Sequence, residues 1–453
     1  MVLLRSAMTK ANLERKISLL QATAINMTDM VGIGPFIVLS SVAGIMNGPW
    51  FLYAWVAGAA LSFIDAMVWS ELGSTFPLAG GSFNFLKEGY GPKWGKLMSF
   101  LFVWQTMIQA PLVIASAAIG FSQYLNFIVH MNTIESKMVS GAVVVLIVLL
   151  LYRKIEAIGN ISLLLWLGVL ITMSCIIFGG IAHGNFMAPV MQINDGLSPN
   201  LAFAGLLMAA SSKTMYSYLG YYNVCHLGGE ITDPQRNISR SMFISVAGIA
   251  AFYLLMNISV ASVLPFNTIT DSNFVISDYI SVLAGNTAAN IVTALILWVA
   301  FASVFSATLG YSRIPYAAAK DGAFFSVFAK LHPTKNFPYV SLLVLGGVAF
   351  IFSVFFDRVS DVISAILAVR ILVQFVGQGI GLILLSYRKG RDFIKWKMPL
   401  FPLPVIVGGV TWLAIFYSTG LQMMLSGLIV IALGVIVYLV KSMLAKEWPF
   451  EKK

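Results

Sequence analysis

Long apolar runs alternate with short polar segments along the chain, a pattern typical of a protein that crosses a membrane several times. Runs such as GAVVVLIVLLL (141–151) do not alternate polar with apolar positions, which excludes a transmembrane β-barrel. An apolar run of about 18 residues or more is long enough for a spanning helix. We therefore predict an all-α integral membrane protein with twelve spans, at 17–46, 49–73, 95–127, 138–152, 158–182, 199–225, 240–264, 287–319, 338–356, 360–387, 399–420 and 424–444.

Composition and charge agree with this pattern, because 59% of the 453 residues are hydrophobic and only 10% are charged. The net charge of +10 would suit a nucleic-acid-binding protein, but the basic residues are distributed as in a membrane protein. With a cytoplasmic N-terminus, Lys137 and Arg358 lie outside, Lys213 and Arg370 lie within spans, and the other 24 of the 28 Lys and Arg lie on the cytoplasmic side. We predict cytoplasmic termini in a cell membrane, no bound nucleic acid, and contact with anionic lipids.

The first span is interrupted near its middle by the stretch VGIGPFIVLS (31–40). In a helix interior Gly costs about 1 kcal/mol and Pro about 3 kcal/mol relative to Ala, and Pro also lacks an N–H group. Such a break is tolerated at membrane depth only where protein or a wet cavity covers the backbone. We predict one half-helix that ends near Gly32 and a second that begins near Pro35.

The sixth span, SSKTMYSYLGYYNVCH (211–226), carries a second interruption near Gly220. The first ten spans form two sets of five, 17–182 and 199–387, and an odd number of spans makes the second set inverted relative to the first. Helices broken at corresponding positions of inverted repeats indicate a transporter's substrate site. The alternative is that each break is a simple kink. The two spans at 399–444 follow the repeats and are predicted to be scaffold or dimer surface in a monomer or homodimer, and 1–16 and 445–453 are predicted to be cytoplasmic tails.

The chemistry of such a site suits a zwitterion. Helix N-termini present free N–H groups and a positive dipole end, whereas C-termini present free carbonyls and a negative end. A substrate carboxylate would face the helix that starts at Pro35, and an ammonium group would face the carbonyls that end both first halves. Four tyrosines near Gly220 (216, 218, 221, 222) could gate or bound the pocket, with Tyr216 and Tyr221 preferred by position. The predicted substrate contacts are Gly32, Ile33, Gly34, Pro35, Phe36, Tyr216, Ser217, Tyr218, Leu219, Gly220 and Tyr221.

Four motifs are similar to those of a known family: VGIGPF (31–36), ELGSTFPLAGGSFNFL (71–86), GGEITDPQRNISRS (228–241) and SRIPYAAAKDGAFFSVFAKLHP (312–333). Over nearly its whole length the chain resembles permeases of the amino acid–polyamine–organocation superfamily, which have the inverted-repeat leucine-transporter fold. The resemblance implies uptake or exchange of amino acids by alternating access, with the substrate held on the backbone of spans one and six.

The chain departs from the family pattern at two places. Family members commonly have a small residue between the first-helix glycines, where this chain has Ile33, and Pro35 removes one N–H donor from the carboxylate site. The remaining donors are the N–H groups of Gly34, Phe36 and Ile37, and the added bulk favours a small substrate. Many proton-coupled relatives carry a lysine in span five, where this chain has none and places Trp166 near that position.

Charged residues within spans are costly, at roughly 2.5–3.5 kcal/mol each, so each needs a partner or a role. Asp29 and Lys213 flank the two breaks, and one of them could change protonation or partner during transport. The alternatives are a static Asp29–Lys213 ion pair or a Lys213 side chain that reaches the membrane interface. Asp65, and Arg370 with the Gln374–Gln378 stripe, could line a pathway or form polar contacts between helices.

Other candidate chemistry is sparse. Ser303 and Ser306 could bind sodium together with first-span carbonyls, or they could bond back to their own helix. Glu230 with Arg236 and Arg240 could form an inner gate or an ordinary solvated loop. The four histidines are scattered and the two cysteines do not form a metal-binding pattern, so we predict no metal, no cofactor and no enzyme activity.

The prediction from sequence is therefore a secondary active transporter for a small or medium neutral amino acid, working by symport or exchange. Neutrality is preferred because Lys213 near the site would repel a second positive charge on the ligand. A polyamine or basic amino acid transporter, with Asp29 or Asp65 as counter-charge, is the alternative. A sensor built on a transporter scaffold is the alternative from another functional class.

Overall fold

The computed structural model describes residues 13–193, 200–356 and 359–450. Most of the predicted N-terminal tail, the first residue of the second repeat (199), Arg358 and the last three residues of the C-terminal tail lie outside the described residues. The described part is helical, and its only β-type pairings are two isolated bridges, Ile17 with Ile231 and Ala79 with Leu227.

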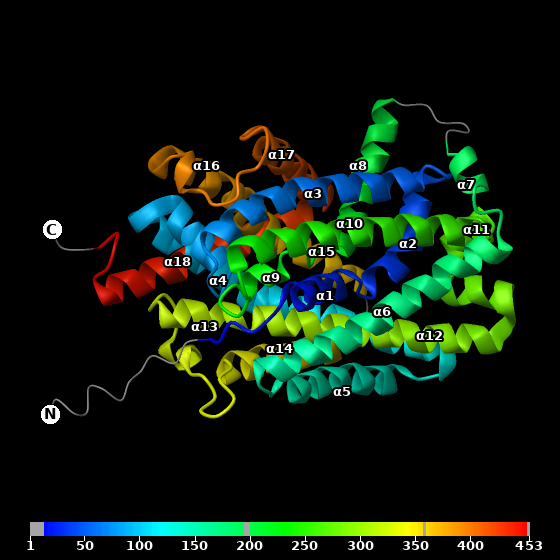
Figure 1. Cartoon of the computed structure of the whole chain (residues 1–453), viewed down its shortest axis with the longest axis horizontal. Helices are drawn as coiled ribbons and strands as arrows, with labels where there is room; N and C mark the ends of the chain where they lie inside the picture. Colours follow the sequence, from blue (N-terminus) through cyan, green and yellow to red (C-terminus); the bar gives the residue numbers. More distant parts are fainter. Residues whose placement is uncertain (1–12, 194–199, 357–358, 451–453) are drawn as a thin grey trace.

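Eighteen α-helices are present among the described residues, and Figure 1 shows them packed into one elongated bundle. They are α1 (Leu19–Met30), α2 (Gly34–Met46), α3 (Phe51–Thr75), α4 (Ser82–Ile128), α5 (Thr133–Leu151), α6 (Ile155–His183), α7 (Ala188–Met191), α8 (Leu201–Tyr218), α9 (Asn223–His226), α10 (Pro234–Ala261), α11 (Phe266–Asp271), α12 (Val275–Tyr311), α13 (Arg313–Lys320), α14 (Tyr339–Phe355), α15 (Val359–Arg370), α16 (Gln378–Lys389), α17 (Leu403–Ser418) and α18 (Leu421–Ala445). Three short elements are η1 (Ser326–Ala329), the π-helix η2 (Ile371–Gly377) and η3 (Arg391–Phe393).

Each of the twelve predicted ranges contains a helix or a group of consecutive helices. Within the described ranges, eight helical segments are long and apolar enough to cross a membrane, or nine if the bent pair α1 and α2 counts as one span. The helices α14 and α17 are apolar but shorter. The multi-pass membrane protein is thus supported, whereas the count of twelve crossings and the inverted repeat remain predictions.

Two helices are longer than their predicted spans because each continues through a glycine. The helix α4 contains Gly91 at φ +79°, so a short helical segment precedes the span predicted from residue 95. The helix α12 likewise contains Gly285 at φ +81°, close to the predicted start at 287. Both glycines have a positive φ that other residues rarely tolerate, and each marks a kink between two helical segments.

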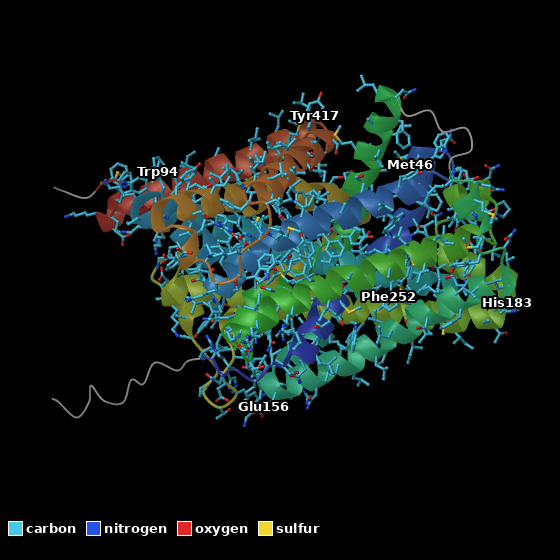
Figure 2. All side chains as sticks on the ribbon, turned by 45° about the horizontal axis from the view of Figure 1, so that its top comes forward. Met46, Trp94, Glu156, His183, Phe252 and Tyr417 are labelled. Atoms are coloured by element: carbon cyan, nitrogen blue, oxygen red, sulfur yellow. The ribbon has the colours of Figure 1, made fainter. Side chains whose placement is uncertain are left out.

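The loops alternate between the two ends of the bundle, as successive crossings require. In Figure 2, Trp94 and Glu156 lie at one end, and Met46 and His183 lie at the other. Trp94 and Glu156 belong to segments predicted to be cytoplasmic. His183 belongs to a segment predicted to be outside, and Met46 is the last residue of the first predicted span. Which end faces the cytoplasm remains a prediction from the basic residues.

The start of α1 is fixed by contacts at the end of the bundle that carries Glu156. Ser18 and Gln21 form a reciprocal cap, in which each side chain accepts the other's backbone N–H. Just before it, Ile17 pairs with Ile231, and Lys16 forms an ion pair with Glu156 at the start of α6. These contacts hold α1 against α6 and α10, in the interior of the bundle (Figure 1).

Candidate functional site

The first span is broken at GIGP. The helix α1 ends at Met30, α2 begins at Gly34 with Pro35 in its first turn, and their axes differ by 45°. The proline suits this position because it needs no hydrogen-bond acceptor in the first turn of a helix. The start of α2 therefore leaves backbone N–H groups unpaired, as the sequence pattern predicts. The first half ends two residues earlier than expected.

The sixth span is broken at Gly220. The helix α8 ends at Tyr218, Leu219 is extended, Gly220 has φ +125°, and the four-residue helix α9 begins at Asn223. A Cβ atom on Gly220 would lie 2.8 Å from the backbone nitrogen of Met30, at the end of α1. The two breaks therefore meet, and glycine is required both for its backbone conformation and for this close approach.

A cavity lies where the breaks meet, with a volume of about 40 Å³, which is room for roughly three water molecules. Its wall is formed by residues of both breaks and of α4, α12 and α15. They are Asp29, Met30, Gly32, Ile33, Gly34, Val113, Ala117, Tyr216, Ser217, Leu219, Gly220, Tyr222, Ser303, Tyr311 and Arg370.

Seven of the eleven predicted substrate contacts belong to this wall; the four that do not are Pro35, Phe36, Tyr218 and Tyr221. The Tyr218 hydroxyl instead donates to the Trp55 carbonyl at 3.1 Å, and the Tyr221 hydroxyl donates to the Asp65 carboxylate. Tyr216 and Tyr222 therefore line the cavity, whereas Tyr218 and Tyr221 contact neighbouring helices.

Tyr222 and Tyr311 are wall residues that the sequence prediction did not select. Tyr222 is one of the four tyrosines near Gly220. The direction of its side chain depends on how the backbone turns after that glycine, which the sequence does not reveal. Tyr311 lies at the end of α12 and accepts a hydrogen bond from Gln109 Nε2 at 3.1 Å. No pattern near Tyr311 in the sequence indicates that it belongs to the site.

Arg370 supplies the positive charge of the cavity and is 1% exposed. It donates through Nη2 to the Tyr222 hydroxyl and through Nε to Gln374 Oε1 at 3.3 Å. Its guanidinium lies over the rings of Tyr222 and Phe375, at 5.3 and 5.2 Å from their centroids. Arg370 ends α15 at the start of the π-helix η2, an element that often occurs at functional sites.

Asp29 supplies the negative charge of the cavity wall, so the wall carries one acidic and one basic side chain. The static Asp29–Lys213 ion pair was one alternative from the sequence. Lys213 is partly buried on α8 and is not part of the cavity wall. Asp29 and Arg370 are far apart in sequence, so spacing alone could not place them in the same cavity wall.

Asp65 forms the polar contact between helices that was one of its two predicted roles. Its side chain is 4% exposed and accepts hydrogen bonds from Tyr221 and from Trp412 Nε1, the latter at 3.2 Å. It therefore holds α3 to α17 and to the break after α8.

The predicted stripe of Arg370, Gln374 and Gln378 is interrupted. The π-helix η2 has a wider turn than an α-helix, and Gln378 Oε1 accepts a hydrogen bond from Ser82 Oγ at 2.5 Å.

Side chains from neighbouring helices cap the backbone at both breaks. Asn26 Oδ1 accepts the Val224 N–H at 2.9 Å, which caps α9 from α1. Ser306 Oγ donates to the Ile25 carbonyl at 2.7 Å, and Ser303 Oγ donates to the Asp29 carbonyl at 3.4 Å. The two serines considered for sodium thus contact first-span carbonyls directly. Within the described ranges, no group of three His, Cys, Asp or Glu side chains could hold a metal ion.

The Ile33 side chain packs away from the middle of the cavity. A Cβ atom on Gly120 of α4 would lie 2.5 Å from Ile33 Cγ2, so Gly120 makes room for this side chain. Among the three donors expected for a carboxylate, the Ile37 N–H bonds to the Ile33 carbonyl at 3.2 Å. Gly34 then remains as the donor residue in the wall.

A buried ion pair lies between the site and the end of the bundle that carries Glu156. Glu230 pairs with Arg313 of α13 at 3.1 Å, and both side chains are almost completely buried. The pairing with Arg236 or Arg240 considered from sequence is therefore wrong, because those two residues lie on the first turns of α10. Burial raises the pKa of the Glu230 carboxyl, and the charge of Arg313 opposes this shift.

Comparison with known proteins adds an independent observation. A family model described as "Amino acid permease" matches residues 17–441. The serine/threonine exchanger SteT of Bacillus subtilis is 24% identical over 399 residues, which cover 87% of this chain and 89% of the relative. The human cystine/glutamate transporter is 25% identical over 86% of this chain and 78% of its own length. The methylthioribose transporter of B. subtilis is 22% identical over 96% and 95%, respectively.

Proposed function

The chain belongs to the amino acid permease family, and on that premise we propose that it carries a small or medium neutral amino acid across the cell membrane. Transport proceeds by alternating access, as symport or exchange, with both chain termini in the cytoplasm. The family and the relatives are transporters, not enzymes. The substrates in the names of the relatives differ, so the choice of a neutral amino acid depends on the site itself.

The observation that carries the proposal is the pair of opposite charges in the cavity wall. Asp29 and Arg370 both line the cavity, and the helix ends add a positive N-terminus at α2 and negative C-termini at α1 and α8. A zwitterion places each of its charges against the opposite one. A ligand with an additional charge would bring that charge into a buried site without a partner for it, which is unfavourable.

Polar groups in the wall also support a ligand with hydrogen-bonding capacity. The Ser217 hydroxyl is buried, lines the cavity and has no hydrogen-bond partner. A buried hydroxyl without a partner costs about 1–3 kcal/mol, and a ligand can remove this cost. The Gly34 N–H at the start of α2 suits the carboxylate, and the carbonyl ends of α1 and α8 with Asp29 suit the ammonium group.

The close packing of the wall favours a small ligand. A Cβ atom on Gly34 would lie 3.0 Å from Tyr216 Cε1, and one on Gly32 would lie 2.6 Å from Ser303 Oγ. Tyr216 is held in place over Gly34 by a 2.9 Å hydrogen bond between its hydroxyl and Ser116 Oγ. An amino acid with a large side chain would have to displace this ring.

Direct binding to the purified protein tests the proposal. A panel of small neutral, large neutral, acidic and basic amino acids and a polyamine is measured by calorimetry or radioligand competition. We expect the small neutral amino acids to bind at least about tenfold more tightly than the charged ones, a difference of about 1.4 kcal/mol. Preference for a basic amino acid or a polyamine would replace the neutral substrate with the cationic alternative.

Transport itself is tested in proteoliposomes loaded with the preferred amino acid. We expect saturable uptake of labelled external substrate that is accelerated by substrate inside. Tight binding without any uptake or exchange would instead indicate a sensor with a transporter scaffold.

A further inference from the structure

One side chain joins the two helix breaks. Tyr253 lies on α10, is completely buried, and places its hydroxyl oxygen 2.7 Å from the Met30 carbonyl oxygen and 3.0 Å from the Ser217 carbonyl oxygen. Met30 is the last residue of α1, and Ser217 is the penultimate residue of α8. A single O–H group therefore serves the C-terminal ends of both broken helices.

These two ends repel each other without a donor between them. The last carbonyls of a helix carry a partial negative charge, and here two such ends converge at one buried point. A hydroxyl has one proton, so it fully satisfies only one of the two carbonyls at a time. The Met30 carbonyl also accepts the Gly32 N–H at 3.0 Å, so the Ser217 carbonyl has the greater unused acceptor capacity, and both residues belong to the cavity wall.

The Tyr253 ring is fixed in this position by aromatic neighbours. The centroid of the Trp55 ring lies 5.2 Å away and that of Tyr218 lies 5.1 Å away, both with edge-to-face geometry. The Tyr218 hydroxyl in turn donates to the Trp55 carbonyl at 3.1 Å. The hydroxyl of Tyr253 is thus held at the junction by packing rather than by its own hydrogen bonds alone.

We propose that Tyr253 is a positioning residue for the substrate's ammonium group. It holds the ends of α1 and α8 together, and in the bound state it donates to one of the two carbonyls while an ammonium N–H occupies the other. The proposal rests on the function proposed above, because it requires a ligand that carries an amine. Tyr253 itself does not line the cavity and acts through the two carbonyls.

The first test compares two hydroxyl deletions in the full-length protein. Tyr253→Phe removes the shared donor, and Tyr279→Phe is the matched control, because the Tyr279 hydroxyl donates to the Ile176 carbonyl at 2.8 Å, between α12 and α6. We expect Tyr253→Phe to raise the KM for uptake about five- to tenfold, with a smaller change in the maximal rate. Tyr279→Phe should leave KM within about twofold. Equal KM values for Tyr253→Phe and the unmodified protein would refute the proposal.

The second test asks whether Tyr253 and the ammonium group act on the same carbonyls. The dissociation constants of the preferred amino acid and of its N-methyl derivative, which has one fewer N–H, are measured for the unmodified protein and both variants. We expect the penalty for N-methylation to change at least about threefold in Tyr253→Phe and to remain unchanged in Tyr279→Phe. An unchanged penalty in both variants would show a structural role only and would overturn the proposal.

These outcomes also separate this proposal from the proposed function. If the unmodified protein binds no amino acid or amine, the proposed function is wrong. If it binds one and Tyr253→Phe binds it equally well, the proposed function stands and only the role of Tyr253 is wrong. Thermal unfolding and gel filtration of each variant confirm that the comparison is made on folded protein.

Discussion

The two helix breaks occupy matching places in the sequence pattern but have different structures. After the first break, α2 continues for thirteen residues, and its N-terminus opens into the cavity. After the second break, α9 has only four residues, and Asn26 already caps the Val224 N–H. The positive helix end available to a ligand is therefore that of α2, whereas both breaks contribute negative ends. This asymmetry supports the proposed binding mode, in which the carboxylate faces the first break and the ammonium group faces the junction of the two.

The largest expected effect comes from Gly220, where the two breaks touch. Gly220→Ala forces a Cβ atom to 2.8 Å from the Met30 nitrogen at φ +125°, so we expect a loss of about 2–4 kcal/mol in stability and loss of transport. Thermal unfolding in detergent and uptake in proteoliposomes measure both. Gly205→Ala on α8 is the control, because a Cβ atom there meets nothing within 4 Å. Unfolding of Gly220→Ala at the temperature of the unmodified protein would mean that the breaks do not meet.

The next largest effect should come from Arg370, the positively charged residue that α15 contributes to the cavity wall. Arg370→Gln removes the positive charge from a cavity wall that keeps the Asp29 carboxylate, and we expect binding of the preferred amino acid to weaken at least about thirtyfold. Adding Asp29→Asn to Arg370→Gln should recover part of any lost thermal stability, because no uncompensated charge then remains. Lys213→Gln, outside the cavity wall, should change binding by less than about threefold. A greater loss of binding in Lys213→Gln than in Arg370→Gln would mean that Lys213, and not Arg370, is the positive charge on which binding depends.

The size limit of the first break can be tested on α2. Gly34→Ala brings a Cβ atom to 3.0 Å from Tyr216 Cε1, so we expect a rise in KM of about three- to tenfold. The rise should be greater for a larger substrate than for a smaller one. Gly44→Ala on the same helix, where a Cβ atom meets nothing within 4 Å, is the control. An equal rise for both substrates would show that Gly34 affects α2 generally rather than the size of the site.

The positions of the helices and of both breaks could be read from local patterns in the sequence. Runs of apolar residues locate the spans, and the low helix propensity of Gly and Pro locates the interruption at GIGP. Neither inference requires knowledge of distant contacts. The helix α1 ends two residues before the expected position, at the point where Gly220 closely approaches the Met30 backbone.

The partners of the charged residues could not be predicted, because each pairing joins distant segments. Asp29 and Arg370 line the same cavity whereas Lys213 lies outside its wall, and Glu230 pairs with Arg313 and not with the nearer Arg236. Helix rotation decides these contacts. The same argument applies to Tyr253, whose position in an apolar run of α10 does not reveal that its hydroxyl reaches both breaks.

The smallest effect is expected when sodium is replaced in the uptake assay. This test concerns the two serines of α12 that contact carbonyls of α1 at the first break. Ser306 Oγ donates to the Ile25 carbonyl, and Ser303 Oγ donates to the Asp29 carbonyl, so both hydroxyls already tie α12 to α1 without an ion. We therefore expect uptake to change by less than about 1.5-fold when choline replaces sodium. Ser306→Ala should lower stability by about 1 kcal/mol, the usual net value of one hydrogen bond, equally in sodium and in choline. A stabilising effect of sodium that disappears in Ser306→Ala would instead show that this hydroxyl and the first-span carbonyls bind the ion, and the end of α1 would then be held by a cation as well as by Tyr253.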